Sequence, residues 1–415
     1  MGNKKHIAVL STMYYPDMGA PSACIDKYLQ LIKDQYIIHI ITKTTEVKIP
    51  RHPYFDIRYI SRLLHKTRNW CHNNIKGHHL VLFSKLILAG INIIKLLQTQ
   101  VSFPSAQKWE ITEYLKVLEK LNSENHLHTV IPVSNNFVTQ LAMLKFKKRH
   151  PDIKWIAFIT DPYSDSYIYY KYKLFKQFWK KLNLKKEQQI YDCSDHILLT
   201  AEMYKFIPTA FQVSPFKIHK IEFALQKHKE KSNENTNNEQ SNDCRLIYAG
   251  LFYKEIRNPE FTLNTLSQVP DISLDLFVCQ GECEEIISKF ISSHIHRYEY
   301  VDHERYIKMI NSEYDILVNV GNNATLQAPS KMLELLSTGK PIINFYHAKD
   351  SQYDMIKKYP LGLNIGKEDV NAVDKASRFC KQMKNKQISY EEVQALFPDN
   401  NLEKQVQLLL NLIEE

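Results

Sequence analysis

Glycine is scarce in this chain, with only ten among 415 residues. Neither GxGxxG nor GxxxxGK followed by Ser or Thr occurs, which excludes the usual dinucleotide-binding fingerprint and the P-loop. A glycine placed directly after a strand is therefore expected to mark backbone that needs a positive φ or a close approach to a ligand. Gly250, Gly321 and Gly339 hold such positions.

Cysteine lacks any ordered pattern, because the seven cysteines are scattered, odd in number and contain no CxxC pair. This distribution excludes a disulfide framework and favours free thiols in a reducing compartment, so we expect a cytoplasmic protein. The seventeen histidines include no HExxH and no Cys/His ligand spacing. We therefore predict neither a metal nor another cofactor.

No segment has the pattern of a signal peptide or of a membrane span. The first residues, MGNKKHIAVLSTMYYP, contain only a short apolar run that alternates like a strand. The longest apolar stretch, 80–97, contains Lys85 and Lys95 and is at the margin of the roughly 20 residues that a span needs. We expect it not to cross a bilayer.

Positive charge exceeds negative charge, with 54 Lys and Arg against 45 Asp and Glu and a formal net charge of +9. This excess suits nucleic acid, an anionic membrane or a phosphorylated substrate. No nucleic-acid-binding motif accompanies it, so no nucleic-acid partner is predicted. The basic runs 145–150 and 171–186, interleaved with aromatic residues, fit either an anionic bilayer or solvated helix faces, and 171–186 is the better membrane candidate.

Buried strands followed by amphipathic helices repeat in both halves of the sequence. The length predicts two domains, and the repeat predicts parallel sheets covered on both faces by helices. In the first unit of the repeat, a helix from about residue 21 places apolar residues on one face. The predicted strands are 6–10, 36–42, 129–133, 155–160, 196–200, 245–249, 274–279, 316–320 and 341–345.

A polar segment without apolar residues, 228–243, marks the expected domain boundary. We predict a first domain over 1–228, a solvated linker over 229–243 and a second domain over 244–395. The last part, 396–415, is predicted to contain a helix whose apolar stripe packs back on the first domain.

The segment 329–341, PSKMLELLSTGKP, combines phosphate-binding and packing features. Ser330 opens a predicted helix whose free N–H groups favour phosphate, and Lys331 adds a charge. A helix-capping role does not explain why a glutamate stands at position 334. A carboxylate that accepts two ribose hydroxyls would explain Glu334, and a solvent-facing glutamate is an equal alternative. Gly339 is expected to end the helix.

A second basic loop follows the strand that ends at Gly250. Lys254 and Arg257 lie in this loop, and Asn258-Pro259 is expected to start the next helix. The two cations sit where a diphosphate would need them, and two exposed basic side chains in a surface loop are the alternative.

Two loops of the first half follow predicted parallel strands. Asp161 comes directly after the strand 155–160, at the edge where such sheets bind ligands, although Asp-Pro is also a common turn. The loop 11–20 contains Tyr14, Tyr15, Asp17 and Gly19. Its tyrosines are candidates for contact with an acceptor, and aromatic packing within the loop is the alternative.

Taken together, these residues resemble the GT-B glycosyltransferases of family 4, especially the bacterial branch that builds surface polysaccharide. The resemblance spans nearly the whole chain, and the PSKxxEL…TGKPII block is its most specific part. It rests on IYAGLFYKEIRNPEFTL, YDILVNVGNNATLQAPSKMLELLSTGKPII, ITDPYSDSY, FPSAQKW and the glycine-containing loop after the first strand.

The resemblance implies two Rossmann-like domains facing a cleft, and a retaining transfer of a sugar from a nucleotide-sugar to a glycan or a polyprenyl-diphosphate-linked acceptor, without a metal. The enzyme would work in the cytoplasm, at the inner face of the membrane, in the synthesis of capsule or lipopolysaccharide. The implied donor-binding residues are Gly250, Ser330, Lys331 and Glu334; the implied catalytic residues are Asp161, Lys254 and Arg257; and the implied acceptor-binding residues are Tyr15 and Gly19.

The chain departs from the family pattern at three places. Leu326 stands where the family often has a first glutamate, Leu251 replaces an arginine, and Thr160-Asp161 replaces His-Asp. Two other functions therefore stay open, a nucleotide-sugar epimerase of the same architecture and a non-catalytic, membrane-associated relative.

Overall fold

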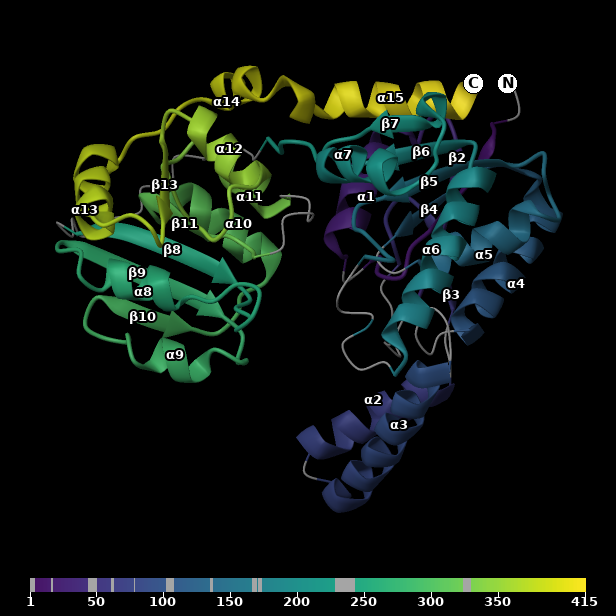
Figure 1. Ribbon diagram of the computed structural model, residues 1–415, viewed down its shortest axis with the longest axis horizontal. Helices are drawn as coiled ribbons and strands as arrows, with labels where there is room; N and C mark the ends of the chain where they lie inside the picture. The colour runs from purple at the N-terminus through teal and green to yellow at the C-terminus, as the bar shows by residue number, and fades with distance from the viewer. Residues whose placement is uncertain are drawn as a thin grey trace. The chain divides into compact units, whose positions relative to one another are not determined.

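The chain forms two compact units, Met1–Glu222 with Glu403–Glu415, and Phe223–Leu402, called here the first and second units (Figure 1). This computed structural model describes residues 4–15, 18–43, 51–60, 63–77, 79–101, 108–134, 137–165, 170, 174–227, 243–323 and 330–415. The predicted linker 229–243 lies outside these residues except for Asp243, so its structure stays a prediction.

A seven-stranded parallel sheet forms the middle of the first unit, in the order β3-β2-β1-β4-β5-β6-β7. Its central strands are mostly apolar and buried on both faces, as a parallel sheet between helices requires. The sequence predicted all of these strands except β3 and β7. Charged and apolar residues alternate along β3, and β7 has only three residues. The strands are β1 (His6–Leu10), β2 (Ile37–Lys43), β3 (Asp56–Ile60), β4 (Leu127–Ser134), β5 (Lys154–Ile159), β6 (His196–Leu199) and β7 (Ile218–Lys220).

Helices flank this sheet on both faces. Helices α4, α5, α6 and α7 contribute buried residues to one core cluster on one face of the sheet, whereas α1 lies outside this cluster (Figure 1). Helix α1 buries Ile25, Tyr28, Leu29 and Ile32, the face that the sequence pattern predicted. The helices of the first unit are α1 (Ala20–Ile32), α2 (Leu63–Lys76), α3 (Val81–Val101), α4 (Lys108–Asn125), α5 (Val138–Lys147), α6 (Lys176–Cys193), α7 (Ala201–Ala210) and α15 (Leu402–Glu414).

The last helix, α15, packs on the first unit although it comes last in the chain. It buries Val406, Leu409 and Ile413. Glu414 accepts from Lys5 Nζ at 2.6 Å and from the Tyr36 hydroxyl at 2.5 Å. The predicted return of the C-terminal helix to the first domain is therefore confirmed.

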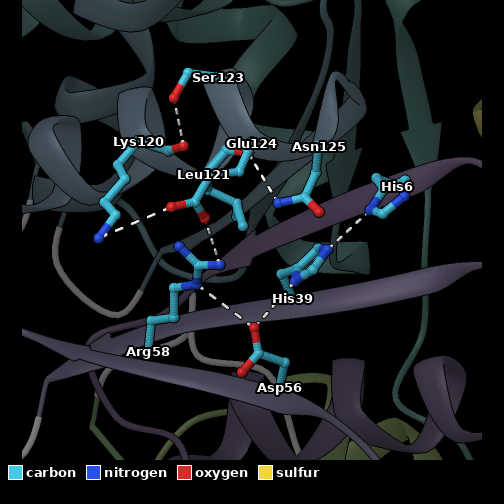
Figure 2. A network of polar contacts seen from close by, with 9 residues as sticks. All are labelled: His6, His39, Asp56, Arg58, Lys120, Leu121, Ser123, Glu124 and Asn125. Carbon is cyan, nitrogen blue, oxygen red and sulfur yellow. Dashed lines mark hydrogen bonds and ion pairs between the residues drawn. The ribbon is translucent and has the colours of Figure 1, made fainter.

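A polar network joins strand starts at the amino edge of the first sheet (Figure 2). The His6 and His39 rings meet at 3.0 Å, and His39 Nδ1 lies 3.2 Å from Asp56. Arg58 links Asp56 to Glu124 at the end of α4. These ionisable groups therefore stabilise strand starts, at the edge opposite to the one where parallel sheets bind ligands.

The second unit contains a six-stranded parallel sheet in the order β10-β9-β8-β11-β12-β13. This order repeats that of the first sheet, apart from its seventh strand. The predicted strand 316–320 is confirmed to the residue, and the other predicted boundaries are correct to within two residues. The strands are β8 (Cys244–Gly250), β9 (Ile272–Val278), β10 (Ile295–Tyr298), β11 (Ile316–Val320), β12 (Ile342–Tyr346) and β13 (Gly362–Gly366).

Side-chain caps start several helices of the second unit. Asp302, Asp350 and Ser389 each accept a main-chain N–H of the first turn, and Ser389 forms a full capping box with Glu392. The helices are α8 (Glu260–Leu266), α9 (Glu284–Ser288), α10 (His303–Ser312), α11 (Ser330–Leu336), α12 (Ser351–Lys358), α13 (Ala372–Met383) and α14 (Tyr390–Leu396).

The cysteines and the longest apolar helices bear on two further expectations. All seven cysteines are free thiols, as predicted. Within the described ranges, no helix combines the length and apolar character that crossing a bilayer requires.

Candidate functional site

The candidate site of the second unit lies at the point where its strand order reverses, between β8 and β11. Open parallel sheets bind ligands outside the carboxyl ends of the strands at such a point. Strand β8 ends at Gly250, and Gly321 follows β11 directly. Helix α11 then begins at Ser330, so the predicted donor-binding residues come from the end of β8 and from the helix that follows β11 in the chain.

Gly250 and Lys331 lie against each other at this edge. The Lys331 Nζ hydrogen-bonds to the Ala249 carbonyl oxygen and lies 4.4 Å from the centre of the Tyr248 ring. A Cβ atom on Gly250 would be 2.8 Å from Lys331 Nζ, and Gly250 has φ 148°. The positive φ that the sequence suggested for Gly250 is therefore present, and the close approach of a ligand stays a prediction.

The Lys331 ammonium is enclosed, although the rest of its side chain keeps some exposed surface. Burial and then the charge of Arg257 lower the pKa of Lys331 to about 7, against an opposing effect of Glu334. A buried cation without a full counter-charge favours an anionic ligand, because the ligand would restore the charged form.

Arg257 is held by the loop after β11. Its Nε donates to Asn322 Oδ1 at 2.8 Å, and the Asn323 N–H donates to the Ile256 carbonyl oxygen at 2.8 Å. A main-chain bridge between Tyr253 and Arg257 closes the loop on itself. The two asparagines therefore hold the basic loop beside the end of β11.

Unlike Arg257, Lys254 makes no side-chain bond to the described residues of the loop after β11. It is exposed, and its main-chain N–H donates to Glu282 at 3.2 Å. The next helix, α8, begins at Glu260, one residue after the predicted Pro259, while Asn258 Oδ1 accepts the Glu260 N–H at 2.9 Å. Asn258 thus makes the predicted capping bond, and the difference concerns only the assigned boundary.

Helix α11 buries Met332, Leu333, Leu335 and Leu336, which confirms the predicted packing face. Glu334 is half-buried, and its Oε1 lies 3.4 Å from His303 Nε2 on α10. Thr338 is buried, and its hydroxyl donates to the Leu335 carbonyl oxygen at 2.7 Å.

The end of α11 agrees with the sequence. Gly339 adopts φ 69°, and a Cβ there would meet the Ile388 carbonyl oxygen at 2.0 Å, so this position requires glycine. Of the departures from the family pattern, Leu251 is exposed directly after Gly250. Leu326 lies outside the described residues.

Asp161 follows β5 in the first unit, at the carboxyl edge of the sheet. Thr160 Oγ1 donates to Asp161 Oδ2 at 2.9 Å. Burial raises the pKa of the Asp161 carboxyl above its ordinary value, and the bond from Thr160 opposes this shift. A carboxyl group with a raised pKa at a strand end is a candidate for proton transfer.

Glu187, which the sequence reasoning did not single out, anchors the loop after Asp161. This buried residue of α6 accepts the Ser164 N–H at 2.9 Å and the Tyr191 hydroxyl at 2.7 Å. Tyr170 donates to the Ser164 carbonyl oxygen at 2.9 Å and accepts from Asn183 at 2.7 Å. A buried polar network therefore holds this loop against α6.

The loop after β1 packs on a second buried group. The Tyr14 hydroxyl donates to Asp26 of α1, and His52 Nε2 lies 3.9 Å from the same carboxylate. Tyr15 meets the His52 ring edge-on, with ring centres 4.9 Å apart, and Gly19 is the N-cap of α1. Aromatic packing, the alternative for this loop, is therefore present, and an acceptor contact stays a prediction. Asp17 lies outside the described residues.

Comparisons with known proteins place the fold but no family. No family model and no curated protein sequence match this chain. Solved structures do match over nearly the whole length. Sucrose-phosphate synthase from Thermosynechococcus elongatus is 13% identical and has a TM-score of 0.63, with 99% of this chain and 98% of that chain covered. The lipopolysaccharide outer core galactosyltransferase WaaB in its apo form is 12% identical, with a TM-score of 0.58 and 98% and 99% coverage.

A UDP-N-acetylglucosamine 2-epimerase also matches, at 13% identity and a TM-score of 0.51, covering 98% of this chain and 91% of that chain. The chain has the GT-B fold. The expected fold class is therefore confirmed, with two parallel-sheet α/β domains.

Proposed function

We propose that this chain is a retaining GT-B glycosyltransferase of family 4, of the hexosyltransferase type, that moves a sugar from a nucleotide-sugar to a glycan or lipid-linked acceptor. The observation that carries the proposal is the enclosed Lys331 ammonium beside Arg257 and Gly250. Fixed cations at a strand end are suited to a diphosphate, the part that all nucleoside-diphosphate sugars share.

The donor would lie along α11 and the basic loop. Ser330 and Lys331 contact the diphosphate in this proposal, and Glu334 accepts hydroxyls of the ribose. Glu334 suits that role because it keeps part of its surface exposed and its present neighbour, His303, is itself mostly exposed. A ribose can therefore replace His303 without opening the core.

Charge on the leaving nucleoside diphosphate would be neutralised by Arg257 and Lys331, with Lys254 as a third cation. Preorganised charges of this kind stabilise a leaving group that becomes more negative in the transition state. Because the chain supplies these cations itself, we propose that the reaction needs no metal. Activity that persists in excess chelator supports this part, and loss that Mg²⁺ restores refutes it.

The first unit would bind the acceptor. Asp161 is proposed to orient the acceptor hydroxyl or the reacting sugar, because its carboxyl lies at a strand end and has a raised pKa. Tyr15 and Gly19 are proposed to contact the acceptor from the loop after β1. The setting we propose is the cytoplasmic face of a bacterial membrane, in the synthesis of capsule or lipopolysaccharide.

Transfer can be tested by mass spectrometry of reactions that contain UDP- or GDP-sugars with a polyprenyl-diphosphate-linked sugar. We expect a product heavier by one hexose unit. We expect Glu334→Ala to lower kcat/KM by about a hundredfold and Asp161→Asn by at least about tenfold, because each change removes a single contact at the reacting complex. Full turnover by Asp161→Asn would remove Asp161 from the mechanism.

An epimerase is the second candidate, favoured by the likeness to a solved UDP-N-acetylglucosamine 2-epimerase. An epimerase converts the nucleotide-sugar with no acceptor present, whereas the proposed transferase needs both substrates. Incubation with the nucleotide-sugar alone therefore separates the two functions, and an isomerised sugar in that reaction would favour the epimerase.

A further inference from the structure

Among the described residues of the first unit, the helical hairpin of α2 and α3 carries an apolar surface that no other helix or strand covers. Figure 1 shows the two helices side by side, and among the described elements only α2 packs extensively on α3. Ser84 and Ile91, which share one side of α3 by helical spacing, are buried. The opposite side of α3 is exposed.

That opposite side is apolar and exposed. The exposed fractions reach 75% at Leu82 and 65% at Leu86. With 3.6 residues per turn, the exposed apolar side chains fall within about 120° of the helix circumference, and no charged residue lies in this arc. The arc consists of Leu82, Phe83, Leu86, Ile93, Ile94 and Leu97.

A contiguous apolar surface of this kind marks an interaction site in a protein that is otherwise folded. The charge of the hairpin indicates which partner it fits. Between Asp56 and Glu110 the sequence contains no acidic residue. The hairpin residues 63–101 include five cationic side chains, which are Lys66, Arg68, Lys76, Lys85 and Lys95.

We propose that the α2–α3 hairpin docks on an anionic lipid bilayer, with the apolar arc of α3 in the headgroup region. Apolar side chains on one face and an excess of Lys and Arg without Asp or Glu are the features of helices that lie in the interface plane. The helix lies on the membrane and does not cross it, in agreement with the lack of a spanning helix in the described ranges.

A second copy of this chain is a poorer partner for the same surface. Two hairpins that met through α3 would bring together five positive charges each and no negative charge. Like charges in contact oppose association, whereas anionic lipids attract the same charges. The inference deepens the proposed function, which includes a lipid-linked acceptor, but its test uses no sugar and no acceptor.

The test measures binding of the full chain to vesicles by flotation. We expect at least about tenfold stronger binding to vesicles of phosphatidylcholine with 30% phosphatidylglycerol than to phosphatidylcholine alone, and weaker binding in 0.5 M NaCl. The double substitution Leu86→Asp with Ile93→Asp should weaken binding at least about tenfold, because it places two charges in the apolar arc. Val370→Asp is the matched control, since Val370 is 98% exposed in the second unit.

A second measurement needs no variant in the arc. Trp70 of α2 is exposed, so its fluorescence should shift to the blue with anionic vesicles and be quenched by lipids with brominated acyl chains. Trp70→Phe should remove this signal.

Vesicle binding that is absent, or that survives Leu86→Asp with Ile93→Asp unchanged, overturns the proposal. So does a concentration-dependent dimer that this double substitution dissociates. Binding of nucleoside diphosphate, measured without vesicles, reports separately on the proposed function.

Discussion

The two units share a strand order but differ in the chemistry at their ligand-binding edges. In the second unit, cationic side chains gather around the glycine that ends β8, and the Lys331 ammonium is enclosed. In the first unit, the corresponding edge has a carboxylate with a raised pKa, Asp161, and a tyrosine-rich loop. The same strand order therefore presents cations at the edge of one sheet and a carboxyl group with a raised pKa at the edge of the other.

The units also differ in how their helices begin. Asp302, Asp350 and Ser389 cap helices of the second unit through their side chains. In the first unit, the N-caps described for α1, α5, α6 and α7 make no such side-chain bond. Side-chain caps thus support three helices of the second unit, and a buried network around Glu187 supports the first unit.

The largest expected effect is a loss of nucleoside-diphosphate binding at the carboxyl edge of the second unit's sheet. Gly250→Val should weaken nucleoside-diphosphate binding by at least about a hundredfold, because a β-branched residue is strained at this φ and its Cβ displaces Lys331. Gly281→Val is the control, since no atom lies within 4 Å of a Cβ at Gly281. Calorimetric titration compares the two, and equal losses would show that the effect is not specific to the site.

The next largest expected effect is a loss of stability when the buried network of the first unit is broken. Glu187→Ala leaves the Ser164 N–H and the Tyr191 hydroxyl without their acceptor, which should cost about 2–3 kcal/mol in the free energy of unfolding. Glu119→Ala removes partly exposed contacts with Arg149 and His150 and should cost less than about 1 kcal/mol. Urea unfolding measures both. If Glu187→Ala also weakened nucleotide binding, this result would contradict the proposal that the second unit alone binds the nucleotide.

A smaller effect concerns pH and the Lys331 ammonium. Its pKa of about 7 in the free protein should rise when a diphosphate binds, so binding takes up a proton. Affinity should then fall as pH rises above about 7, by up to about tenfold per pH unit. Lys331→Arg keeps its charge throughout this range and should flatten the dependence. Titrations between pH 6.5 and 9 test this, and a flat profile for the unsubstituted protein contradicts it.

The smallest effect tests capping in the second unit. Ser389→Ala removes an acceptor of the Glu392 N–H at 3.2 Å and should lower the free energy of unfolding by about 1 kcal/mol. Ser288→Ala changes an exposed serine that caps no helix start and should change stability by less than about 0.5 kcal/mol. Thermal unfolding of the two variants decides whether the cap matters.

Strands were predictable wherever a continuous apolar run was followed by a polar turn, as in β1 and β11. Strand β3, DIRYI, was not predicted because charged residues alternate along it, and β13, GLNIG, was not predicted because glycine opens and closes it. Periodicity therefore finds buried central strands and misses those whose pairing comes from tertiary context.

The candidate site was predictable only in part. Sequence placed Gly250 at a strand end, Arg257 in the loop that follows it and Lys331 at the start of a helix, and the structure brings the three together. Spacing could not show that Asn322 holds Arg257 or that Glu187 holds the loop after Asp161, because each pair is separated by more than twenty residues. A buried carboxylate on a mostly basic helix, such as Glu187 on α6, is the one signal that could have drawn attention to it.

Calorimetric titration of nucleoside diphosphates tests the central claim most directly, because every proposed role in the second unit starts from diphosphate binding at Lys331. We predict that at least one of UDP, GDP, ADP and dTDP binds, and that Lys331→Ala together with Arg257→Ala weakens this binding by at least about a hundredfold. No binding of any of the four, or binding that the double substitution leaves unchanged, would contradict the account.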